Sequence, residues 1–146
     1  MARYYAREFV GVLDGTTKPP LLADGQLINA KERRIRSTIN FADRTLNPGD
    51  DVVIGVRPVN SYLISHRVLA SVSLGSTTLA IGTPGNTGKY RAAAPFTTPD
   101  TPAPVATAAN VAADKLSAAE TMIATFGAAA TPGAGLLVID TFYTYD

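Results

Sequence analysis

The segment from Tyr62 to Gly82 constrains the fold most, because apolar and polar side chains alternate along its first part. A period of two over this length predicts a half-buried strand with one face toward the core. The inward set is Ile64, His66, Val68, Ala70, Val72 and Leu74, and the outward set is Ser65, Arg67, Ser71 and Ser73, with Leu69 as an apolar exception. Gly75 and Ser76 then predict a tight turn, and a second strand follows over residues 77–81.

Turn signals divide the rest of the chain into further short strands. Strands are predicted over residues 34–39, 51–56, 121–126 and 136–145, with Pro58 ending the second of these. The proline-rich residues 95–113 predict a surface connection, with one or two helical turns between Val105 and Ala113. Seven or eight strands with no long helix predict an all-β fold, an antiparallel β-sandwich or barrel.

Residues 1–31 read as an extended arm, and residues 32–146 as a single β-sandwich domain. A short strand is predicted over residues 7–13. Three turn signals then follow within a dozen residues, and Pro19 and Pro20 favour an extended backbone. The arm has little local means of burying its aromatic and apolar side chains. Two arrangements stay open: an arm that lies across a neighbouring subunit, or a first strand packed on its own domain.

The composition argues against an enzyme and against a metal or cofactor site. A chain of 146 residues has the size of one domain, and it contains no cysteine and one histidine. No signal peptide and no membrane-spanning run is visible, so we expect synthesis in the cytoplasm and no membrane contact. His66 is predicted to be a hydrogen-bonded core or interface residue, and Asp50 with Asp51 to be turn residues instead of calcium ligands.

Residues 82–89 are rich in glycine but depart from a phosphate-binding loop. Five residues separate Gly82 from Gly88 where that motif needs four, and Tyr90 stands in place of the metal-binding Ser or Thr. The residues that follow predict a short strand instead of a helix whose first turn would hold phosphate. We therefore predict a glycine-rich hairpin loop.

Basic residues gather in the first part of the chain, which has a net charge of +3 up to Arg44 against −2 beyond it. Arg34 and Arg36 share one strand parity, so a strand with an arginine-lined face is predicted. The guanidinium fork suits carboxylate or phosphate partners. Because no aromatic residues are interleaved, no direct nucleic-acid binding is expected, and an ordinary solvated surface is the plain alternative.

Four stretches resemble small virion proteins of tailed bacteriophages, which are encoded near the major capsid protein. They are residues 74–82, 88–94, 120–125 and 135–145, a sharp turn, a glycine loop and two strands. The resemblance is to capsid decoration, or cement, proteins, and it implies a jelly-roll-like sandwich. It covers none of the chain before residue 50.

The resemblance implies a structural protein that binds the outside of the major capsid protein lattice as a homotrimer or other homo-oligomer. Aromatic and arginine side chains dominate protein interfaces. We therefore expect the interface to include Tyr4, Tyr5, Arg7 and Phe9 of the arm and Arg33, Arg34 and Arg36 of the basic strand. The alternatives are a head–tail connector or tail component, a carbohydrate-binding β-sandwich module, and an enzyme that uses His66.

Overall fold

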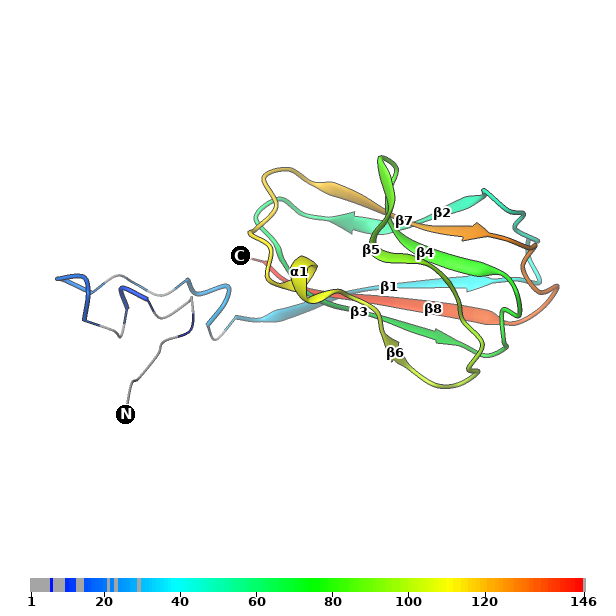
Figure 1. The fold of residues 1–146 in the computed structure, drawn as a ribbon, viewed down its shortest axis with the longest axis horizontal. Coiled ribbons are helices and arrows are strands. Elements are labelled where there is room, and N and C mark those ends of the chain that lie inside the picture. The colour runs from blue at the N-terminus through cyan, green and yellow to red at the C-terminus, as the bar shows by residue number, and fades with distance from the viewer. Residues whose placement is uncertain are drawn as a thin grey trace.

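Two antiparallel four-stranded sheets lie face to face in the computed structural model of the chain (Figure 1). The structure describes residues 6, 10–12, 15–20, 22, 24–28 and 30–145. The elements are β1 (Glu32–Asn40), β2 (Asp51–Arg57), β3 (Tyr62–Ala70), β4 (Thr78–Thr83), β5 (Asn86–Pro95), β6 (Ala103–Pro104), α1 (Ala108–Val111), β7 (Glu120–Gly127) and β8 (Leu136–Thr144). No helix among these residues is long and apolar enough to cross a membrane.

The strand order is that of a jelly roll. Sheet A runs β1-β8-β3-β6 and sheet B runs β2-β7-β4-β5. The first strand therefore pairs with the last, the second with the seventh, the third with the sixth and the fourth with the fifth, all antiparallel. Eight strands wrapped as two Greek keys in a double sheet define this architecture. The predicted jelly-roll-like, antiparallel β-sandwich is confirmed.

The alternating segment forms β3, and its inward face is largely as predicted. His66, Val68 and Ala70 are each buried. The prediction for Ile64 is wrong, because a bulge between Leu63 and Ser65 shifts the register, so that Leu63 is buried and Ile64 is half-buried. The strand also ends at Ala70, before the predicted Leu74, and β4 lies in the opposite sheet, so these two consecutive strands do not pair.

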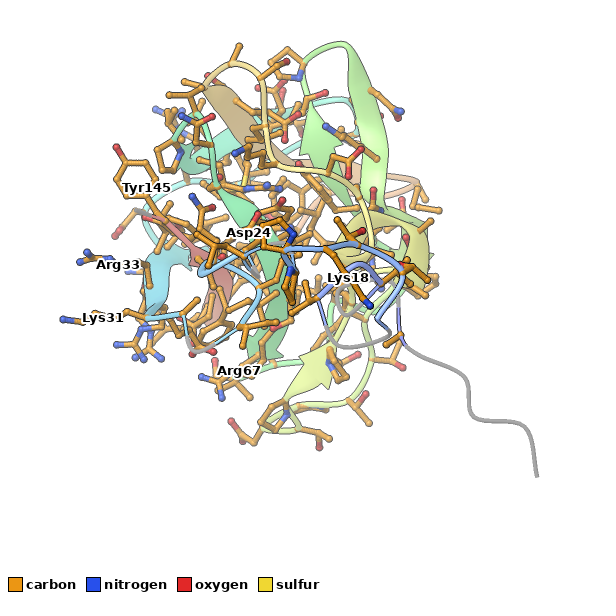
Figure 2. All side chains as sticks on the ribbon, turned by 90° about the vertical axis from the view of Figure 1, so that its left-hand side faces the viewer. Lys18, Asp24, Lys31, Arg33, Arg67 and Tyr145 are labelled. Atoms are coloured by element: carbon orange, nitrogen blue, oxygen red, sulfur yellow. The ribbon has the colours of Figure 1, made fainter. Side chains whose placement is uncertain are left out.

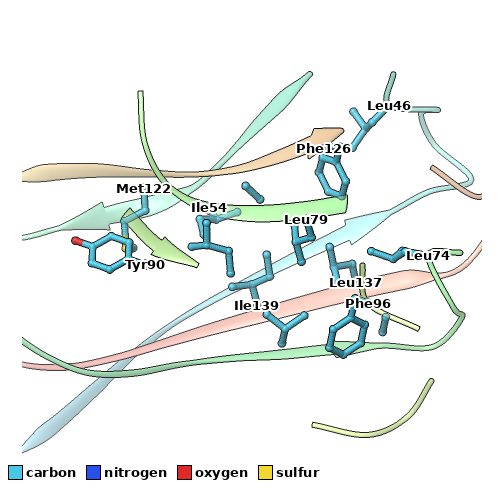
Figure 3. Packing of buried hydrophobic residues seen from close by; sticks show 14 of the residues in the cluster. Leu46, Ile54, Leu74, Leu79, Tyr90, Phe96, Met122, Phe126, Leu137 and Ile139 are labelled. Carbon is cyan, nitrogen blue, oxygen red and sulfur yellow. The ribbon is translucent and has the colours of Figure 1, made fainter. Parts of the chain in front are cut away.

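Apolar side chains from both sheets form one core between them (Figure 3). Leu79 of β4 and Leu137 of β8 are fully buried, and Phe41 meets Phe126 edge to face with ring centroids 6.2 Å apart. Tyr90 and Met122 lie at one end of this cluster in Figure 3, and the hydroxyl of Tyr90 points away from the leucines. Apolar packing therefore fills most of the sandwich and gives way to polar groups at that end.

Other local predictions are confirmed. The predicted strands correspond to β1, β2, β7 and β8, the helical turn is α1, and the glycine-rich loop joins β4 to β5 as a hairpin. The strand predicted over residues 7–13 is wrong in its described part, because Val10 to Val12 form a turn with Gly11 at φ 78°. Its other residues lie outside the described part of the chain.

The described residues before β1 extend from one end of the sandwich (Figure 1). Tyr62 at the start of β3 donates a hydrogen bond to Asp24, with 3.0 Å between Oη and Oδ2. Gln26 is buried at this junction, whereas Leu22 is 97% exposed. The segment therefore contacts the sandwich near residues 24–26 and leaves an apolar side chain uncovered nearby.

The hairpin between β4 and β5 provides a test of the fold. Gly82 lies so close to the other arm of the hairpin that a Cβ atom there would collide with the backbone of Asn86 and Thr87. We expect Gly82→Ala to lower the free energy of unfolding by more than about 2 kcal/mol, measured by chemical denaturation. Gly85→Ala in the same loop, where a Cβ meets no atom within 4 Å, is the matched control and should change it by less than about 0.5 kcal/mol. Equal effects of the two substitutions would contradict this hairpin geometry.

Candidate interaction surface

Three of the expected interface residues lie in the described part of the chain, and they do not share one face of their strand. Tyr4, Tyr5, Arg7 and Phe9 lie outside the described residues. Arg33, Arg34 and Arg36 are exposed on β1, which is an edge strand of sheet A. Successive strand residues point to opposite faces, so Arg34 and Arg36 share the outer face of sheet A while Arg33 points the other way. Figure 2 shows Arg33 next to Lys31, both directed away from the body, with Arg67 apart from them.

A buried carboxylate joins two arginines on the outer face of sheet A. Arg36 donates to Asp140 through Nε and Nη2, at 2.7 Å to Oδ1 and 2.8 Å to Oδ2, and Arg67 donates through Nη2 at 2.6 Å to Oδ2. The side chain of Asp140 is 2% exposed, whereas those of Arg36 and Arg67 are 48% and 43% exposed. The hydrogen bond from Arg36, together with Arg67, lowers the pKa of Asp140 to about 2. Asp140 is therefore ionised, and from its buried position it holds both guanidinium groups in place.

An aromatic ring and a hollow border this ion pair. The guanidinium carbon of Arg67 lies 5.4 Å from the centroid of the Phe142 ring, a cation–π arrangement. Beside them is a surface hollow of about 390 Å³. Its lining residues are Glu32, Ser65, His66, Arg67, Pro104 and Phe142.

A second polar cluster lies inside the sandwich, at the end where Tyr90 stands. Arg57 is 3% exposed and donates to the hydroxyl of Tyr90 at 3.1 Å and to the carbonyl of Ser61 at 3.2 Å. Tyr90 and Lys89 both donate to the carboxylate of Glu120. Burial opposes the charge of Glu120, but the bonds from Lys89 and Tyr90 outweigh it and lower the pKa of that carboxyl. The bonds from Lys89 and Tyr90 therefore hold the carboxylate of Glu120 in place at this end of the sandwich.

His66 belongs to the same region and is a hydrogen-bonded core residue, as predicted. It is fully buried, its Nδ1 lies 2.9 Å from Oγ1 of Thr141, and its ring centroid is 4.7 Å from that of Tyr90. Burial, and then the charge of Arg57, lower the pKa of His66 to about 4. Within the described residues, no three His, Cys, Asp or Glu side chains are grouped so that they could hold a metal ion.

Sequence reasoning missed most of these partners. Arg67 belongs to the predicted outward face, and Asp140 is the one charged residue within the strand predicted over residues 136–145. A lone acid in a β-branched strand is a usable signal, because such a charge requires a partner when it is buried. Arg57 and Glu120 stand at strand ends, where a charge is ordinary, and nothing local indicates that they meet.

No family model matches the chain, and no curated protein matches it. Several solved structures do match the chain. The chain is similar to a chain of the cyanophage Pam1 capsid asymmetric unit, with a TM-score of 0.68 at 17% identity, over 92% of this chain and 100% of that one. A chain of the Ralstonia phage GP4 capsid gives 0.59 at 17% identity, over 80% and 84% of the two chains. A chain of the acidic stable capsid of Helicobacter pylori bacteriophage KHP30 gives 0.59 at 7% identity, over 78% and 87%. At these identities the likeness shows a common fold.

The buried histidine predicts how stability depends on pH. In the unfolded chain His66 binds a proton near pH 6.5, but in the folded chain only near pH 4, so protons favour the unfolded state between these values. We expect the free energy of unfolding to fall by about 2–3 kcal/mol from pH 7 to 4.5, measured by urea denaturation. The variant His66→Asn, which keeps a polar atom near Thr141, should lose this decrease of the free energy of unfolding with falling pH. A wild-type stability that is flat over that range would contradict a neutral, buried His66.

Proposed function

We propose that this chain is a structural virion protein of a tailed phage, bound to the outside of the major capsid protein lattice as a decoration protein. The observation that supports this best is the jelly-roll fold shared with phage capsid chains, which spans all of the Pam1 chain. The protein would be made in the host cytoplasm and added to the head.

The chemistry of the described residues agrees with a binding role. At one end of the sandwich the buried Arg57 donates to the hydroxyl of Tyr90, which in turn donates to the half-buried Glu120. The outer face of sheet A presents arginine and aromatic side chains, the types that dominate interface hot spots. A rigid β core with such a face suits attachment to a repeating shell, where many copies of one contact add up.

We further propose that residues 1–31 act as an arm that lies on a neighbouring subunit. Leu22 is 97% exposed, Val10 55% and Leu27 46%, so apolar surface in the described part of the segment is left uncovered by its own sandwich. Tyr4, Tyr5, Arg7 and Phe9 would supply anchors there, and a homotrimer or other homo-oligomer would bring a neighbour within reach. An arm that folds back on its own sandwich is the alternative.

A head–tail connector or tail component would use the same fold, and a carbohydrate-binding sandwich is a further alternative. These functions differ in the place on the phage head where the protein binds and in the number of copies that bind there. Decoration requires attachment over the whole head surface, a connector requires a single ring at one vertex, and a carbohydrate-binding module requires no capsid at all.

The test is addition of the purified protein to heads that were assembled without it and carry no tails. We expect saturable binding at many sites over the head, seen by electron cryomicroscopy, together with greater resistance of the heads to heating. Density confined to one vertex would favour a connector. Heads that take up no protein would contradict the proposal.

Deletion of residues 2–13 tests the arm within the same assay. We expect retention on washed heads to fall at least tenfold, because the aromatic anchors are lost, while the unfolding midpoint of the sandwich stays unchanged. The matched control is replacement of the same residues by a Gly/Ser segment of equal length, which keeps the linker but not the anchors and should behave like the deletion. Undiminished retention of the deletion variant would contradict an anchoring arm.

A further inference from the structure

The outer face of sheet A presents a regular grid of side chains. Strand pairing aligns β1, β8 and β3 in three successive rows, each with one residue from each strand. The rows are Arg34, Phe142 and Ser65; Arg36, Asp140 and Arg67; and Thr38, Val138 and Leu69. Because these positions share one strand parity, all nine side chains stand on the same face.

We propose that this grid is an interaction surface for an acidic protein segment, with its arginines receiving carboxylate side chains of the partner. This inference rests on the proposed function, because it names the face and the chemistry by which the protein would bind the shell.

The charge of the face favours an anionic partner. Three arginines stand against one carboxylate, so the grid has a net charge of +2, and +1 when Glu32 of the adjoining hollow is counted. Asp140 engages Nε and Nη2 of Arg36 and Nη2 of Arg67, so it does not use Nη1 of either guanidinium. Both side chains are nearly half exposed and can each reach a second carboxylate.

The two central arginines are held in place before any partner arrives. Asp140 fixes their guanidinium groups, and Phe142 supports that of Arg67 from one side. Binding then costs less side-chain entropy than it would for free arginines. Asp140 therefore acts as a positioning residue, which explains why a fully ionised acid is maintained in the middle of a basic face.

The apolar members of the grid point to a protein partner and not to nucleic acid. Phe142, Val138 and Leu69 are half-buried on this face and offer apolar contact beside the charges. A protein interface combines aromatic, aliphatic and arginine side chains in this way. Binding to duplex nucleic acid rests on roughly 6–10 phosphate contacts, whereas this grid has three arginines.

The decisive variant is Arg34→Glu, tested for binding to tail-free heads that lack the protein. The side chain of Arg34, which is exposed on β1, makes no hydrogen bond or ion pair within the described part of the chain. The unfolding midpoint of the variant should therefore be unchanged, while its affinity for heads should fall at least tenfold. Arg67→Gln should also weaken binding at least tenfold, with Arg36 still paired to Asp140. Lys115→Glu, an exposed charge of the same sign outside the grid, is the control and should stay within twofold of wild type.

Contact with a carboxylate is tested by cross-linking. An Arg34→Lys variant treated with a zero-length carbodiimide on heads should form an amide bond to an Asp or Glu of a head protein, identified by mass spectrometry.

If wild type binds heads but Arg34→Glu binds as well as Lys115→Glu, the grid is not the interface and the proposed function survives. If wild type itself fails to bind, the proposed function fails first. Retention of labelled duplex DNA that is lost in Arg34→Glu would overturn the protein partner in favour of nucleic acid.

Discussion

Sheet A depends on β8, which is hydrogen-bonded to β1 along one edge and to β3 along the other. Its inner side chains, Leu137 and Ile139, are buried in the core between the sheets. Its outer side places Asp140 between an arginine from each neighbouring strand. One strand thus joins apolar packing, main-chain pairing and charge pairing. The position of the basic face is therefore set by the same register that closes the core.

The strands could be predicted from the sequence because their signals are local. Alternation within β3 and the glycine-rich hairpin each lie within about a dozen residues. The hairpin is found as expected, and the alternation holds from His66 to Ala70. Pairing is not local. β3 and β4 follow one another across a short connection, yet they lie in different sheets, and the bulge after Leu63 has no counterpart in the alternation. The jelly-roll order came from a resemblance, since periodicity does not choose partners.

The same distinction applies to the candidate site. The shared parity of Arg34 and Arg36 was visible in the sequence, but their neighbours were not. Arg36 meets Asp140 across 104 positions and Arg67 meets it across 73, and only the strand order brings them together. Arg33 was grouped with them because it is adjacent in sequence, although the strand geometry turns it to the other side. The inner cluster around Glu120 was missed for the same reason.

The place of β8 also bears on how the protein forms. Among the described strands β8 is the last in sequence, yet it lies between β1 and β3. These two strands therefore cannot be joined into sheet A until β8 has been synthesised. Until then, the edges of β1 and β3 that pair with β8 have no partner strand. The charges of Glu32, Arg33 and Arg34 on β1 discourage strands of other molecules from pairing there. Folding is therefore expected to be slow, because its closing step pairs strands that are distant in the sequence.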